Sequence, residues 1–165
     1  MKMKSFLVIL SLLNTMLFSN CEGFLPNYYE VDYANNTDYD VYVYIRDNRG
    51  KQLNIVYPDT TISFNEENVS IIKAHSHIKI NIGTLPIEKY FNNIPSDTLS
   101  VFYFHADTIS KYSWEEIQQD YNILQRYDLS LEDFKRLSDK NGVPVITYPP
   151  NEAMKDMRMY PPYRH

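Results

Sequence analysis

Alternating apolar and polar residues predict most of the secondary structure of this 165-residue chain. The clearest alternation lies in residues 40–46, where Tyr42 and Tyr44 point to the side opposite the valines and the isoleucine. Residues 47–50 have the composition of a hairpin turn. Other runs rich in β-branched and aromatic residues predict strands at 28–33, 51–57, 60–64, 69–73, 78–82, 98–104 and 143–148. The run at 98–104 is apolar on both sides, which predicts a central strand.

Helix signals are concentrated in the second half of the chain. Ser113 is followed three residues later by Glu116, the spacing of a capping box. Apolar residues then recur at helical spacing and predict a helix from 114 to about 127. These residues are Trp114, Ile117, Tyr121 and Leu124. Further helical segments are predicted at 86–91, from Ser130 to a stop at Asn141-Gly142, and at 151–159.

Together these elements predict a single α+β domain over residues 28–165. We expect an antiparallel sheet or a small β-sandwich, with two helices inserted before the last strand. No internal repeat or interdomain linker interrupts this region. A chain of this length can bury a core without disulfide bonds.

The N-terminal segment has a different pattern. Lys2 and Lys4 precede a short apolar run at 6–18, and small or polar residues lead to Cys21, the only cysteine. This order is typical of a secretory signal peptide, and the run is too short for a transmembrane helix. We interpret residues 1–20 as the signal peptide and residues 21–27 as a tether.

The sequence Phe18-Ser19-Asn20-Cys21 resembles the lipobox of bacterial lipoproteins, especially the relaxed boxes of Bacteroides-type bacteria. The resemblance implies that the Cys21 thiol is acylated with chains such as palmitate. The protein would then be anchored in the outer membrane of the cell envelope, on either the periplasmic or the surface side. The alternative is ordinary signal cleavage, which would leave Cys21 as a free thiol.

A second resemblance involves the domain itself. Segments 96–116, 126–130 and 146–150 are similar to a group of small lipoproteins of Bacteroides-type bacteria, with 126–130 interpreted as a turn. Exported proteins of such bacteria carry O-glycans on an Asp-Thr motif. That resemblance implies glycosylation at Thr60, Thr98 or Thr108. Asp-Thr pairs are also turn formers by themselves, which is the alternative interpretation.

Charge excludes some partners. The full chain has a net charge of −5, and loss of Lys2 and Lys4 with the signal peptide leaves 14 basic and 21 acidic residues, a charge of −7. An acidic chain does not fit nucleic acid, which requires a basic face, and it does not favour anionic lipid surfaces beyond the acyl anchor.

Catalytic and metal-binding signals are weak. His75 and His77 would share a face on a strand and could approach one zinc ion, but no third ligand has a matching spacing. We interpret them as exposed histidines and predict no metal site and no cofactor. Nucleophile elbows, zinc-binding helices and glycine-rich phosphate loops are absent from the sequence.

These observations favour a non-enzymatic, lipid-anchored protein that binds or scaffolds another envelope component. A surface protein that binds glycans through Tyr42 and Tyr44 is the first alternative, because tyrosine rings stack on sugars. The same tyrosines would otherwise simply pack within the sheet. A hydrolase with an unrecognised site is the second alternative.

Overall fold

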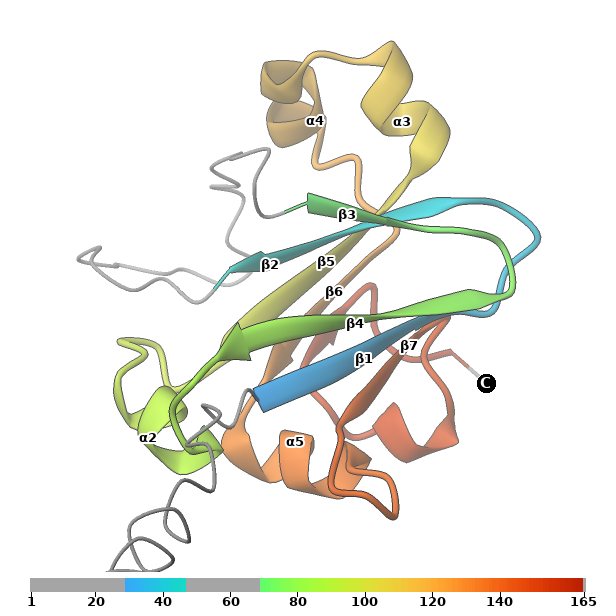
Figure 1. The fold of residues 1–165 in the computed structure, drawn as a ribbon. Helices are drawn as coiled ribbons and strands as arrows, with labels where there is room; N and C mark the ends of the chain where they lie inside the picture. Colours follow the sequence, from blue (N-terminus) through green and yellow to red (C-terminus); the bar gives the residue numbers. More distant parts are fainter. Residues whose placement is uncertain (1–28, 47–68, 165) are drawn as a thin grey trace, which may run out of the picture.

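A computed structural model describes residues 29–46 and 69–164 (Figure 1). This part of the chain has an α+β fold, which confirms the predicted class. The strands are β1 Tyr29–Asn35, β2 Val41–Arg46, β3 Val69–Ile72, β4 Ser76–Gly83, β5 Leu99–His105, β6 Gln125–Leu129, β7 Val145–Tyr148 and β8 Met159–Tyr160. The helices are α2 Ile87–Asn92, α3 Ala106–Lys111, α4 Trp114–Asp120, α5 Leu131–Leu137 and the short 3-10 helix η2 Glu152–Met154.

The described strands form two sheets. A three-stranded sheet has the order β4-β1-β7, and a five-stranded sheet has the order β3-β2-β5-β6-β8. Neighbouring strands are antiparallel except β1 and β7, which are parallel. β5 occupies the centre of the larger sheet, as its apolar sequence predicted.

Two chain segments cross from one sheet to the other at the same corner. β1 continues into β2, and β3 continues into β4, so that the two segments pair with each other on both sides of the corner (Figure 1). Each segment therefore contributes to both sheets, and the corner sets how the sheets lie on one another.

Asn35 holds this corner together and is fully buried. Its amide nitrogen Nδ2 donates to the carbonyl oxygens of Tyr39, Ile72 and Lys73 at 2.7, 3.2 and 3.2 Å. Its Oδ1 accepts from the backbone N–H and the hydroxyl of Thr37 at 3.0 and 2.7 Å. One side chain thus satisfies backbone groups of both crossing segments, which a buried corner requires.

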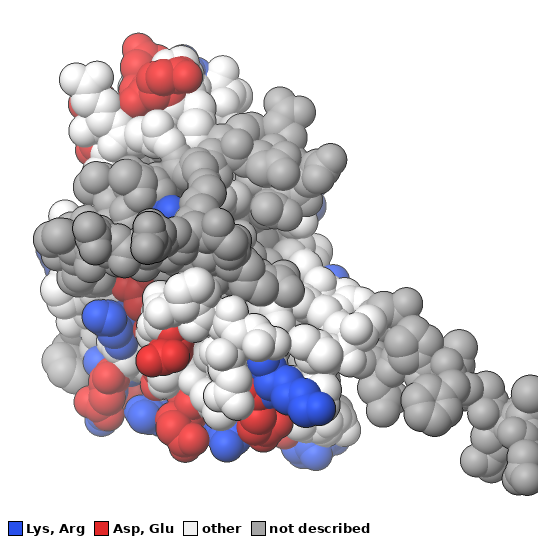
Figure 2. All heavy atoms as spheres, turned by 90° about the vertical axis from the view of Figure 1, so that its left-hand side faces the viewer, with Lys and Arg blue, Asp and Glu red and all other residues white. Residues whose placement is uncertain are grey.

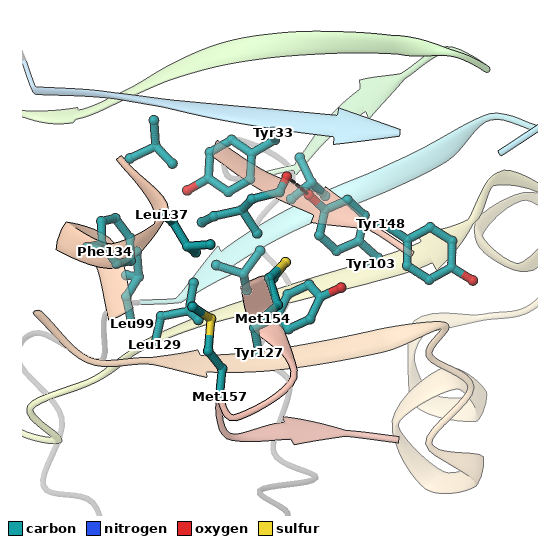
Figure 3. Packing of buried hydrophobic residues seen from close by; sticks show 14 of the residues in the cluster. Tyr33, Leu99, Tyr103, Tyr127, Leu129, Phe134, Leu137, Tyr148, Met154 and Met157 are labelled. Carbon is teal, nitrogen blue, oxygen red and sulfur yellow. Dashed lines mark hydrogen bonds between the residues drawn. The ribbon is translucent and has the colours of Figure 1, made fainter. Parts of the chain in front are cut away.

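The main core lies between the sheets and is rich in tyrosine (Figure 3). The Tyr103 hydroxyl donates to the carbonyl of Ile146 at 3.1 Å, and the Tyr127 hydroxyl donates to that of Thr147 at 2.8 Å. These bonds tie the five-stranded sheet to β7. Burial raises the pKa of Tyr103 well above its usual value, so this hydroxyl remains a donor.

Helices α2 and α5 close one end of the core. Phe91 of α2 packs edge to face on Phe134 of α5, with ring centroids 5.1 Å apart. The helix predicted to begin at Ser130 is present, a capping box between Ser130 and Asp133 opens it, and Phe134 and Leu137 are buried. Pro86 is the N-cap of α2, not its first helical residue as expected, because its ψ of 142° is extended.

The predicted long helix at 114–127 is wrong in its second half. α4 ends at Asp120, and Tyr121 adopts a left-handed conformation with φ of 52°. Residues 125–129 instead form β6, which pairs with the central strand β5, so the segment interpreted as a turn at 126–130 is mostly strand. Pairing with a buried strand outweighed the local helical period. The two helices predicted before the last strand correspond to α4 and α5. Both precede β7 in the chain, and β6 lies between them.

Two other helix boundaries also differ from the prediction. α5 ends at Leu137, before Asn141-Gly142, because Ser138 is extended and its hydroxyl donates to the Phe134 carbonyl at 2.9 Å. In the predicted helix at 151–159, only Glu152–Met154 is helical, and β8 begins at Met159. The turn predicted at 47–50 and the strands at 51–57 and 60–64 lie outside the described residues.

Several carboxylates make the fold sensitive to acid. Asp139 accepts the backbone N–H groups of Val143 and Asn141 at 2.9 and 2.7 Å, and these bonds, led by that of Val143, lower its pKa. Hydrogen bonds from Lys73 and Lys111 likewise lower the pKa of Asp40 and Asp107. A pKa lowered in the folded state stabilises the protein above the unfolded pKa, and this contribution is lost as the pH falls through the folded value.

We therefore expect the Tm to be nearly constant from about pH 5 to 7 and to fall below about pH 4, where free aspartate titrates. Thermal unfolding followed by circular dichroism would measure this. Asp139→Asn keeps an acceptor oxygen but cannot titrate, so its Tm should fall less on acidification than that of the exposed control Asp120→Asn. Equal acid dependence of the two variants would contradict the role given to Asp139.

Candidate functional site

The five-stranded sheet has a second face that does not contribute to the main core. We call it the outer face. The strand register places Tyr44 of β2, Phe102 of β5 and Arg126 of β6 in one row across it. Arg46, Ser100 and Asp128 form the next row. Tyr42 and Tyr44, the candidate ligand-binding residues, therefore lie on this face.

The outer face carries a second apolar cluster instead of an open row of tyrosines. Tyr44 is only 3% exposed and clusters with Phe102, Phe104 and Ile117. Its ring centroid lies 5.9 Å from that of Phe102. For Tyr44 the structure therefore agrees with the interpretation that these tyrosines pack within the sheet, and not with stacking on a sugar. Tyr42 is half-buried at the periphery of the cluster.

α4 is positioned over this cluster by its N-terminal cap. The Ser113 hydroxyl accepts the Glu116 N–H at 3.3 Å, and the Glu116 carboxylate accepts the Ser113 N–H at 2.7 Å, which confirms the predicted capping box. Trp114 then packs on Phe104 with ring centroids 5.5 Å apart, and Ile117 is buried. The carboxylate of Glu116 is thus engaged in capping.

A buried ion pair lies beside the apolar cluster. Arg126 and Asp128 are each 3% exposed, and the Nε and Nη2 atoms of Arg126 both lie 2.8 Å from Asp128 Oδ1. The Ser100 hydroxyl donates to the same oxygen at 2.7 Å. Asp128 Oδ2 is buried and has no hydrogen-bond partner. Asp128 Oδ1 therefore accepts hydrogen bonds from both Arg126 and Ser100.

Arg126 is also held by aromatic residues. Its guanidinium lies 5.3 Å from the Phe102 ring centroid, and Nη1 is 3.5 Å from the Tyr121 hydroxyl. Burial opposes the charged form, but the hydrogen bonds to Tyr121 and Asp128 outweigh it and raise the pKa of Arg126 above its usual value. The guanidinium therefore stays charged inside the sheet, and its neighbours fix its orientation.

Sequence reasoning missed this polar cluster. One long helix was predicted from the apolar stripe of Trp114, Ile117, Tyr121 and Leu124. The segment at 126–130, which contains Arg126 and Asp128, was interpreted as a turn. The alternation of Arg126 and Asp128 with Tyr127 was the available signal, since residues two apart share a face of a strand. Ser100 is buried, and the carboxylate oxygen to which its hydroxyl donates also accepts from Arg126.

The described histidines do not converge on one another. His75 Nε2 lies 2.7 Å from Asp38, and His77 Nδ1 lies 2.9 Å from both oxygens of Asp32. His105 Nδ1 accepts the Asp107 N–H at 3.0 Å and so caps α3. Within residues 29–46 and 69–164, no group of three or more His, Cys, Asp or Glu side chains could hold a metal ion.

The candidate modification sites have separate locations. Thr98 is half-buried beside Asp97, and its hydroxyl donates to the Ser96 carbonyl at 3.3 Å. Thr108 is half-buried in the first turn of α3. Thr60 and Cys21 lie outside the described residues.

Surface charges in the described part are mixed. Figure 2 shows acidic atoms gathered at the end of the molecule formed by α3 and α4, and acidic and basic atoms side by side over the lower half. A depression of about 400 Å³ lies on the C-terminal segment. Lys155 and the Tyr163 hydroxyl, which line it, both bond to Glu152, at 2.7 and 3.1 Å. These bonds brace the segment and define no ligand chemistry.

No protein-family model matches this sequence, no curated protein matches it, and no solved structure matches the fold. In the part of the chain that the structure describes, no helix combines the length and the apolar character needed to cross a bilayer. Arguments about function must therefore start from the residues of this chain.

Proposed function

We propose that this protein is a lipid-anchored component of the bacterial cell envelope, and that its globular domain binds or scaffolds another envelope component without catalysing a reaction. The order of residues 1–21 carries the proposal: two lysines, a short apolar run and then the only cysteine. Acyl chains on Cys21 would contribute about 0.8 kcal/mol per buried CH₂, so two or three chains make a durable anchor.

The domain is compatible with attachment through Cys21. Its core is built from aromatic and aliphatic side chains of the described residues. Cys21, the only cysteine of the chain, has no second cysteine with which to form an internal disulfide and so is left for acylation. Seven residues separate Cys21 from Tyr29, the first residue of β1. A segment of that length reaches on the order of 25 Å when fully extended, which would keep the domain close to the membrane.

A binding role is favoured over a hydrolytic one by how the buried polar groups are used. Ser100 and Arg126 both donate to Asp128, and Glu116 caps a helix. Glycan binding through Tyr42 and Tyr44 as a pair has lost its support, because Tyr44 packs inside the outer-face cluster.

The anchor is tested by growing cells on an alkyne-tagged palmitate and isolating the protein. Wild type should carry the label, and Cys21→Ala should carry none, because it lacks the thiol that is acylated. Ser19→Ala keeps the thiol and is the matched control. Fatty-acid label is the better readout than membrane fractionation, since an unprocessed signal peptide can itself hold the variant in the membrane. Label on Cys21→Ala, or none on wild type, would refute the lipid anchor.

A further inference from the structure

β4 is the edge strand of the three-stranded sheet. At eight residues it is the longest strand in the described part of the chain, and there it pairs only with β1 (Figure 1). An edge strand of this length presents a row of backbone N–H and C=O groups to which another strand can add. Ile78, Ile80 and Ile82 lie against the main core from this edge but are only partly buried.

The side chains of β4 are symmetric in polarity about Ile80. Moving outward from this residue, Lys79 and Asn81 are polar and exposed, and Ile78 and Ile82 are apolar and face inward. A strand whose pattern is the same in both directions matches a second copy of itself in an antiparallel pair.

We propose that two copies of this protein pair through β4 in antiparallel fashion, centred on Ile80. In this register Ile78 faces Ile82 of the second copy, which extends the apolar inner face across the junction. Lys79 faces Asn81 of the second copy on the exposed side. The two three-stranded sheets become one continuous sheet, and the interface is the same patch on both copies, as a two-fold dimer requires.

Charge on the exposed side fits this register. Within one chain, β1 places Asp32 beside Lys79 and Glu30 beside Asn81, and Lys79 Nζ lies 3.5 Å from the Glu30 carboxylate. On the exposed side, one row across the dimer therefore contains Asp32 and Lys79 of one copy, followed by Asn81 and Glu30 of the second copy. No two like charges are adjacent in this row. Like charges directly opposite one another are destabilising, and in this register Lys79 lies opposite the uncharged Asn81 of the second copy.

The test is the mass of the full-length protein, purified in mild detergent and measured by light scattering over a range of concentrations. Wild type should pass from monomer to dimer as the concentration rises. Asn81→Lys sets a lysine opposite Lys79 of the second copy at two symmetric contacts, so the dissociation constant should rise about tenfold. Within its own chain, the new lysine lies beside Glu30, but the variant loses the exposed bond in which Asn81 Oδ1 accepts the Gly83 N–H at 2.8 Å, so the monomer's Tm should fall only slightly.

Two further variants distinguish this interface from others. Gln119→Lys adds the same charge on the exposed surface of α4 and should leave dimerisation unchanged. Lys79→Glu combined with Asn81→Lys restores opposite charges at both contacts and should return the dissociation constant to the wild-type value or below. A monomeric wild type at all concentrations would overturn the proposal. A dimer insensitive to Asn81→Lys, or equally weakened by Gln119→Lys, would also overturn it.

Discussion

Replacing Asn35 with aspartate is expected to lower the free energy of unfolding by about 3–5 kcal/mol, the usual cost of an uncompensated buried charge. The Nδ2 group of Asn35 donates to the carbonyl oxygens of Tyr39, Ile72 and Lys73. A carboxylate has no hydrogen to donate, so the substitution would set an acceptor oxygen against these three carbonyl oxygens. The side chain is fully buried, so water cannot relieve the repulsion.

Urea unfolding followed by circular dichroism measures this loss. Asn36→Asp is the matched control, because Asn36 is the next residue but is exposed, and it should change stability by less than about 0.5 kcal/mol. The deficit of Asn35→Asp should shrink as the pH is lowered, since a protonated carboxyl group regains one donor. If Asn35→Asp and Asn36→Asp cost the same, Asn35 does not hold the corner.

Asp128→Ala should have a comparable effect, a loss of about 3–5 kcal/mol. It would remove the carboxylate that accepts from Arg126 and Ser100, and so take this counter-ion from a guanidinium that is only 3% exposed. The contacts of Arg126 with the Tyr121 hydroxyl and the Phe102 ring are weaker than this ion pair. Equilibrium unfolding in urea measures the change in stability.

The double variant Arg126→Leu/Asp128→Leu separates the loss of the buried ion pair from a simple loss of packing. It removes both charges and keeps most of the side-chain volume, so it should be closer in stability to wild type than Asp128→Ala is. Ser100→Ala deletes only one hydrogen bond and should cost about 1 kcal/mol. A double variant as unstable as Asp128→Ala would show that packing, not removal of the carboxylate from a buried guanidinium, accounts for the loss.

The part of the fold that sequence reasoning predicted correctly depends on local signals. The capping box at Ser113 acts over four residues and is present, and the helix predicted to begin at Ser130 begins there. The alternation in β2 and the two-sided apolar run in β5 likewise reflect which residues can lie on a pleated surface. Such signals were sufficient to predict the α+β class.

The errors arose where a distant segment decided the outcome. Leu124 has helical spacing from Tyr121, yet its N–H bonds to the carbonyl of Tyr103 in β5 at 2.8 Å. The next five residues pair along that strand. The alternation of its strand places Tyr44 on the outer face, and the structure buries it in a cluster with Phe102, Phe104 and Ile117. A sequence pattern assigns residues to faces but does not say whether a face is covered.

The sequence by itself determined the α+β class and most of the strands and helix starts, because helix caps and strand alternation operate within a few residues. It also supplied the N-terminal pattern on which the proposed lipid anchor rests. Only the tertiary structure decided that Asn35 joins two crossing segments and that Arg126 and Asp128 form a buried pair. Those contacts bring together groups that are remote in sequence, such as Asn35 with Ile72, or that share a face only once the strand exists, and no local pattern encodes them.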